Sequence, residues 1–340
     1  MYEFGYDLQP DPEVPQEIQQ VARPATLVHH EGRSAQMKAL TSQLKQLGSE
    51  YARELSSIIG GESLERVRAS RGADVDALHT DIGVDVDRMT QLKAEHAKKA
   101  CSLHEYDRPT TPGAALIAEP PPCEGMSDSW VVYSPPYPGS FWSYEWDRSD
   151  EPDDPVLTRK LDRNNGQIGS SIHTRLSGAD DDDFMNVDYY TAFKLWHQVR
   201  ETGYLEAYLA LRVANLNYSH TASDEWGFSS FNLSHFTLPQ LRILAPDEMW
   251  EIKSRVLYNY FEYSRKAFPF VEWFFPASDI HWFYFKSDQS YLAGSWVLLE
   301  AALQNVAWFV ANDYSITTGS DVDLWLDRVA VRSVPREVIS

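Results

Sequence analysis

The chain has 340 residues, 43% of them hydrophobic, so it is long enough for two folded parts and apolar enough to bury a core. Its 50 acidic and 30 basic residues give a formal charge of −20. This balance argues against nucleic acid and anionic membrane surfaces as partners, because both require clustered Lys and Arg. The sequence lacks an apolar run of about 18 residues, so we expect no ordinary transmembrane segment.

The N-terminal residues have neither a basic start nor an apolar segment, so we predict that a secretory signal is absent. We therefore expect a cytoplasmic protein, with non-classical export left open. The two cysteines, Cys101 and Cys123, are too few for a disulfide framework. Free thiols are favoured over a bridge between them. Residues 1–32 contain four prolines and are interpreted as an irregular N-terminal arm.

Apolar residues then recur at steps of three and four in two stretches, Met37 to Ile58 and Val75 to Leu92. Such spacing places them on one stripe of a helix, and Gly60-Gly61 between the stretches is typical of a helix end. Narrow stripes of this kind are typical of coiled-coil packing. We predict a helical hairpin or coiled coil over residues 33–104, used for oligomerisation or docking.

All eleven tryptophans lie at or after Trp130, and a Pro-rich stretch over 105–127 precedes them and is expected to be a linker. Beyond it the apolar period changes to two, and Asn164-Asn165-Gly166 between two such runs predicts a β-hairpin. Residues 297–310 suit either a strand or a buried helix; a strand is favoured because no capping residue precedes them. Residues 128–340 are thus predicted to form an aromatic-rich, jelly-roll-like antiparallel β-sandwich. The predicted fold class is segregated α+β, with the helical arm preceding the sandwich.

Crowded carboxylates provide one candidate site. Four consecutive aspartates repel one another, and a hard cation such as Ca²⁺ would relieve that repulsion. They are Asp180, Asp181, Asp182 and Asp183. A solvated loop between strands is the alternative interpretation. Calcium is the one cofactor that the sequence suggests.

A second candidate site combines carboxylates with an indole, as a sugar-binding surface requires. Asp224, Glu225 and Trp226 follow a strongly alternating strand, and Gly227 permits a sharp turn after them. Trp142 and Trp146 are expected to add stacking surfaces. The alternative is that these aromatic residues pack the core.

Common catalytic motifs are missing: the sequence contains no GxSxG, Walker loop, GxGxxG or HExxH. We therefore predict a non-enzymatic structural, assembly or binding protein, with a homo-oligomer or larger protein assembly as its setting. The first alternative is a glycan-binding module, lectin-like and calcium-assisted. The second is a subunit of a toxin or injection assembly.

A glycoside hydrolase is the enzyme alternative, because such enzymes need only a pair of facing carboxylates. Five glutamates are candidates for that pair: Glu145, Glu206, Glu225, Glu272 and Glu300. The sequence does not pair them.

Overall fold

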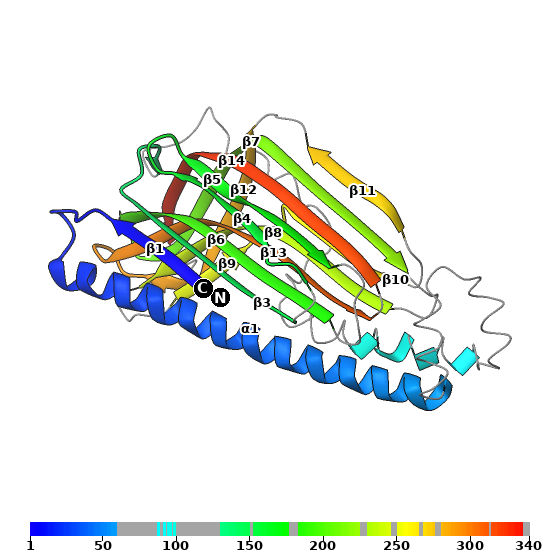
Figure 1. Cartoon of the computed structure of the whole chain (residues 1–340). Coiled ribbons are helices and arrows are strands. Elements are labelled where there is room, and N and C mark those ends of the chain that lie inside the picture. Colours follow the sequence, from blue (N-terminus) through cyan, green and yellow to red (C-terminus); the bar gives the residue numbers. More distant parts are fainter. Residues whose placement is uncertain are drawn as a thin grey trace.

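The computed structural model of the chain describes residues 1–59, 87–88, 91–92, 94–96, 98–99, 130–149, 152–176, 183–224, 230–245, 250–264, 268–275, 280–312 and 314–335. Two seven-stranded antiparallel sheets make up most of this part of the chain (Figure 1). A long helix, α1 (Gln16–Ile59), runs along one side of them.

Sheet A has the strand order β1 (Tyr2–Leu8), β3 (Gly139–Arg148), β6 (Asp183–Gln198), β13 (Trp296–Asn312), β8 (Ser230–Leu244) and β10 (Tyr258–Ser264), with β9 (Trp250–Ser254) paired to β8. Sheet B has the order β11 (Phe268–Phe275), β7 (Gly203–Asp224), β14 (Tyr314–Pro335), β5 (Gln167–Leu176) and β4 (Val156–Asp162). In sheet B, β12 (Ile280–Tyr291) also pairs with β7, and β2 (Val131–Tyr133) with β14.

The predicted β-sandwich is confirmed for the C-terminal part of the chain. Alternation decides which side of each strand is buried: on β7, Leu205, Leu209 and Leu211 are buried while Tyr208 and Arg212 between and beyond them are half-buried. Residues 297–310 lie within β13, so the strand interpretation was correct. The 164–166 turn joins β4 to β5 as predicted.

The segregated α+β fold class with a separate helical arm is wrong. Residues 2–8, expected to be irregular, form β1 and pair with β3 at the edge of sheet A. Helix α1 begins at Gln16 and packs on β3 and β13 of the same sheet instead of forming a coiled-coil stalk. The second predicted helical stripe lies largely outside the described residues.

The first half of the helix, residues 16–32, escaped prediction because its sheet-facing stripe is not apolar. Ala22, Thr26, His30 and Ser34 recur every four residues and are all buried. Helix periodicity is normally recognised from apolar residues, and here three of the four positions are polar. Below them, Lys194 of β6 and Glu300 of β13 form an ion pair.

The space between the sheets holds two apolar clusters with a polar layer between them. Leu303, Leu241 and Val322 belong to one cluster, and Ala307 and Leu233 to the other. Residues at intervening positions of the same strands form the polar layer: His220, His235, Asn305, Thr318 and Thr237. This buried layer fixes how the two sheets lie against each other, because a shifted sheet would leave its polar atoms unpaired.

Candidate functional site

The outward face of sheet B is the candidate site. Helix α1 packs on sheet A, whereas most outward side chains of sheet B are exposed or half-buried. The strand register places one row of them directly side by side across five strands: Phe274 of β11, Asn217 of β7, Asp321 of β14, Ser171 of β5 and Thr158 of β4. The next row contains Asn215, Asp323, Gly169 and Lys160.

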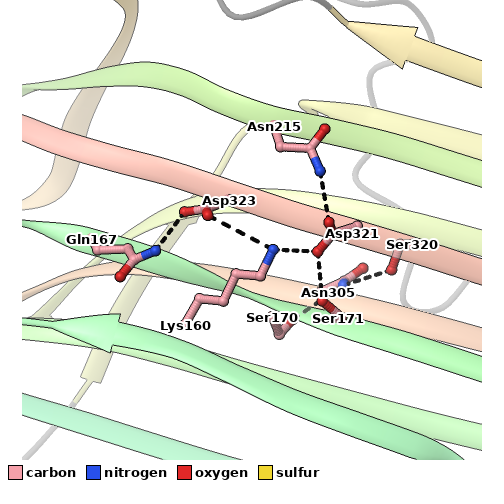
Figure 2. Close-up of polar contacts among 9 residues, drawn as sticks. All are labelled: Lys160, Gln167, Ser170, Ser171, Asn215, Asn305, Ser320, Asp321 and Asp323. Carbon is pink, nitrogen blue, oxygen red and sulfur yellow. Dashed lines mark hydrogen bonds and ion pairs between the residues drawn. The ribbon is translucent and has the colours of Figure 1, made fainter.

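Asp321 is the centre of a hydrogen-bonded network on this face (Figure 2). Its Oδ1 accepts a hydrogen bond from Ser171 Oγ at 2.6 Å and forms an ion pair with Lys160 Nζ, and its Oδ2 accepts one from Asn215 Nδ2 at 2.6 Å. Partial burial by itself would raise the pKa of Asp321, but the hydrogen bonds from Lys160 and Ser171 outweigh it and lower the pKa. The carboxylate is therefore ionised and held in one orientation at neutral pH.

Asp323 extends the network by one position along β14. Its Oδ1 accepts a hydrogen bond from Gln167 Nε2 at 2.9 Å, and its Oδ2 lies 3.8 Å from Lys160 Nζ. Figure 2 shows Ser170 and Ser320 at intervening positions of the same strands, where they accept hydrogen bonds from Asn305 in the interior at 3.1 and 3.0 Å. The network on the outer face thus stands on strands that are also anchored from within.

An exposed phenyl ring lies at the β11 end of this row. Phe274 is 62% exposed, although large aromatic side chains are usually covered. Its cross-strand neighbour Asn217 donates from Nδ2 to Glu272 Oε1 at 3.1 Å. Among the described residues, no donor reaches Oδ1 of Asn217. An apolar ring and an amide oxygen without a donor therefore lie side by side.

An indole held by a guanidinium follows on β14. Arg212 lies over the ring of Trp325, with its Cζ 4.3 Å from the ring centroid. Its Nε and Nη2 donate to the two carboxylate oxygens of Asp327 at 3.0 and 2.9 Å. This bidentate contact fixes the guanidinium, and the guanidinium in turn fixes the indole.

An aromatic cluster occupies the far end of the face, and we define it as Trp130, Tyr208, Trp282 and Tyr284. The ring of Tyr208 lies 5.5 Å from Trp130, 6.3 Å from Trp282 and 5.1 Å from Tyr284. These rings are half-buried. Beside them, Arg332 donates to Glu206 Oε2 from two nitrogens at 2.9 and 2.7 Å.

Two β-bulges separate the aromatic cluster from the Asp321 network. On β7, Val213 and Asn215 oppose consecutive residues of β14, so Ala214 is the extra residue. On β14, Leu326 and Arg328 oppose consecutive residues of β7, so Asp327 is the extra one. Bulges bend a strand and redirect the neighbouring side chains, and here those side chains include Asn215 and Arg212.

The structure places the sequence-predicted sugar-binding residues elsewhere or leaves them outside the described part. Asp224 is the last residue of β7, and Glu225 and Trp226 lie outside the described residues. Trp142 and Trp146 belong to β3 of sheet A and are half-buried. Trp142 stacks on Tyr144 with ring centroids 6.0 Å apart, and Trp146 packs against an apolar core cluster.

The predicted calcium site falls mostly outside the described residues, which exclude Asp180, Asp181 and Asp182. Asp183 begins β6, is buried, and accepts a hydrogen bond from Ser149 Oγ at 2.6 Å. Within the described ranges, no group of three His, Cys, Asp or Glu side chains is arranged to hold a metal ion. Calcium binding by the loop stays a prediction.

Of the five glutamates considered for a hydrolase, four lie in the described part of the chain, and these four do not all share one surface. Glu206 and Glu272 lie on the outer face of sheet B, whereas Glu300 is fully buried beneath α1. Glu145 accepts a hydrogen bond from Ser34 of α1 at 2.7 Å.

The Asp321 network was not predicted from the sequence. One signal for it was present, because Asp321, Asp323 and Trp325 alternate along one strand and must therefore share a face.

No family model matches the chain, and no curated protein is similar to it in sequence. Weak structural similarity relates it to TmCBM61 in complex with β-1,4-galactotriose, with 7% identity, a TM-score of 0.13, and coverage of 51% of this chain and 86% of that chain. The family 11 carbohydrate-binding module of cellulosomal cellulase Lic26A-Cel5E from Clostridium thermocellum has 8% identity and a TM-score of 0.15, over 57% of this chain and 90% of that chain. The enzymatically active domain of bacteriophage CBA120 tailspike protein 4 has 6% identity and a TM-score of 0.14, over 56% of this chain and 18% of that chain. At such TM-scores the similarity carries no argument about function, which has to be argued from the side chains of this chain.

In the part of the chain that the structure describes, no helix has the length and apolar character needed to cross a bilayer.

Proposed function

We propose that the chain is a non-catalytic glycan-binding protein and that the outer face of sheet B is its binding surface. The observation that carries this proposal is the exposed ring of Phe274 in register with Asn217 and Asp321. A pyranose has an apolar face that packs on an aromatic ring and hydroxyls that bond to amides and carboxylates. Both kinds of partner occur here in one row.

The fixed geometry of the polar groups supports binding. Lys160, Ser171 and Asn215 hold Asp321, and Asp327 holds Arg212 against Trp325. Side chains that are already immobilised lose little further entropy when a ligand arrives. The unused hydrogen-bonding capacity of such groups is therefore available to hydroxyls at low cost.

The charge balance of the face supports a neutral ligand. Lys160 pairs with Asp321, Arg212 with Asp327, and Arg332 with Glu206. Each cation in these pairs has its own carboxylate, which leaves little attraction for a sulfated or uronic polymer. A neutral oligosaccharide, laid across an open sheet face, suits this arrangement.

The protonation states support binding over hydrolysis. A glycosidase needs one carboxyl group whose pKa is raised so that it can donate a proton. The pKa of Asp321 is lowered, and so is that of Glu206, because Arg332 and Tyr284 hydrogen bonds outweigh the effect of burial. Both groups are ionised near neutral pH and suit hydroxyl binding instead of acid catalysis.

The test is an array of neutral and acidic glycans probed with the full chain, followed by calorimetry on the best neutral oligosaccharide. We expect F274A and D321N each to weaken binding at least tenfold. F4A is the matched control, because Phe4 is an exposed ring, 41% accessible, on β1 of sheet A. An array without any bound glycan, or equal affinities for F274A and F4A, would contradict the proposal.

A further inference from the structure

β1 leaves one of its two edges without a strand partner among the described residues, because it is the terminal strand of sheet A. Its hydrogen bonds to β3 and the flanking residues fix which backbone groups point outward. Gln9 N donates to Pro138 O, and Trp146 N donates to Met1 O, both at 3.0 Å. In an antiparallel pair these contacts alternate along the strand, so the odd-numbered residues face β3. The N–H and C=O groups of Tyr6 and Leu8 therefore point away from the sheet.

An open cleft of about 1010 Å³ lies at this end of β1. Its walls are the end of β1, from Tyr6 to Leu8, the connection over residues 9–15 and the first turns of α1, including Gln20 and Arg23. Figure 1 shows β1 and the start of α1 running in opposite directions on either side of that connection. Tyr6 and Leu8, whose backbone groups point outward from β1, thus line the cleft.

The connection that closes the cleft is held in place. Gln19 Nε2 donates to Asp11 O at 2.7 Å and to Val14 O at 2.8 Å, and Asp11 N donates back to Gln19 Oε1 at 3.2 Å. Pro10, Pro12 and Pro15 restrict its backbone further. A binding partner therefore meets a formed cleft and does not have to order this segment.

The cleft is acidic. Asp7, Asp11 and Glu13 line it together with Arg23, and Asp7 is also paired with Arg163 outside the lining at 3.2 Å. Trp196 also lines it and is 5% exposed, with its indole Nε1 buried. The site therefore offers carboxylates to cations.

We propose that this cleft binds an extended, basic peptide segment of a partner protein, which adds to the edge of β1 as a further strand of sheet A. The backbone of the peptide pairs with Tyr6 and Leu8, and its Lys or Arg side chains meet Asp7, Asp11 and Glu13. Strand addition of this kind draws affinity from main-chain hydrogen bonds and specificity from alternate side chains. The cleft belongs to sheet A, so it is independent of the glycan surface on sheet B.

The first experiment uses a capped ten-residue peptide of alternating Lys and Thr, titrated into the full chain by fluorescence anisotropy. A second peptide carries N-methyl groups on all ten residues, which removes the pairing N–H groups from both of its edges and keeps the charge. A third has Glu in place of Lys. We expect the first peptide to bind and the other two to bind at least tenfold more weakly. Absence of binding by the first peptide, or equal binding of its N-methylated form, would overturn the proposal.

The second experiment locates the contact. We expect the bound Lys-Thr peptide to slow amide hydrogen exchange at Tyr6 and Leu8 at least tenfold. D7N and D11N should each weaken binding severalfold, whereas D154N, at an exposed aspartate between β3 and β4, should not. Unchanged exchange at Tyr6 and Leu8, or an equal effect of D154N, would mean that the peptide binds through the overall negative charge and would overturn the site.

Discussion

The Lys194 ammonium and the Glu300 carboxylate form an ion pair in the layer between α1 and sheet A, and neither side chain has any exposed surface. Tyr190 OH donates to Glu300 Oε2 at 2.9 Å, and Lys194 Nζ donates to Thr26 Oγ1 of α1 at 3.0 Å. Burial by itself would raise the pKa of Glu300, but the charges of Lys194 and Arg242 outweigh it and lower the pKa. The helix is therefore fastened to the sheet by a charged contact.

Removing one partner of this pair should lower the free energy of unfolding far more than removing both. K194M leaves Glu300 buried without its ammonium, and we expect a loss of about 3–5 kcal/mol in the free energy of unfolding. The double variant K194M/E300L replaces both charges with apolar groups and should recover most of that loss. Urea denaturation of the unmodified protein, K194M and K194M/E300L gives the three free energies of unfolding.

The matched control for the ion pair is D154N, which breaks the exposed contact between Arg148 and Asp154. A surface pair of this kind contributes about 0–1 kcal/mol, so the variant should unfold almost as the unmodified protein does. If K194M were as stable as D154N, the buried pair would not hold α1 on the sheet.

The two interior histidines predict a loss of stability in mild acid. Burial lowers the pKa of His220 from its ordinary value of 6.5 to about 3, and burial together with the neighbouring His220 lowers the pKa of His235 well below 6.5. The folded protein thus keeps both rings neutral where the unfolded chain takes up protons. Their contribution to stability is complete above pH 6.5 and is lost as the pH falls from there towards 3.

The variant H220Q tests this pH dependence. It removes one of the protons taken up on unfolding. Between pH 6 and pH 4 the free energy of unfolding of H220Q should therefore fall with a slope that is smaller than that of the unmodified protein by about 1.4 kcal/mol per pH unit. Urea denaturation at several pH values gives the two slopes. Parallel slopes for H220Q and the unmodified protein would contradict the buried, neutral state of His220.

A glycine on the candidate site gives a third prediction. Gly169 has φ 155°, and a Cβ built on it would lie 2.1 Å from Val322 O on the paired strand β14. Because a backbone atom cannot move aside as a side chain does, we expect G169A to lower the free energy of unfolding by about 1–3 kcal/mol or more. Thermal denaturation checks this value.

The comparison for G169A is G294A. Gly294 has φ 81° but nothing within 4 Å of its Cβ position, so only the backbone strain of about 1–2 kcal/mol applies. A larger loss for G294A than for G169A would show that the close approach to Val322 is easily relieved.

The sequence predicts the strands well because they follow a local rule. The alternation over 205–213 and the Asn-Gly turn at 165–166 each specify structure from adjacent residues. The first half of helix α1 follows no such local rule, since Thr26 contacts Lys194 and Ser34 contacts Glu145, partners more than 100 positions away. A buried polar stripe has the pattern of an exposed one until its partners are known.

The candidate site was missed for a related reason. Asp321, Asn215 and Lys160 come from three strands, and only the register of sheet B brings them together. Adjacency in the sequence indicated Asp224, Glu225 and Trp226 instead, with Trp142 and Trp146 as stacking surfaces, and the last two belong to sheet A. Adjacent residues of a strand point to opposite faces, so a surface on a sheet is built from positions two apart and from neighbouring strands.

The bulge at Ala214 gives the last prediction, because its removal should alter the site without changing which residues are buried. Val213 faces the core and Leu216 faces it again, with Ala214 and Asn215 between them. Deleting Ala214 leaves Val213 inward, Asn215 outward and Leu216 inward, so the buried set is unchanged and only the bend is lost. We expect this variant to unfold cooperatively, with stability reduced by a few kcal/mol at most, and to bind the best glycan at least tenfold more weakly, because Asn215 is no longer directed at Asp321.

Deleting Ser219 from a regular part of the same strand is the control: it moves His220 and Ala222 from the core to the outer face, and we expect no cooperative transition in urea. Equal damage from the two deletions would mean that the sheet needs the bulge in order to fold, and undiminished glycan binding without Ala214 would mean that the bend does not shape the surface.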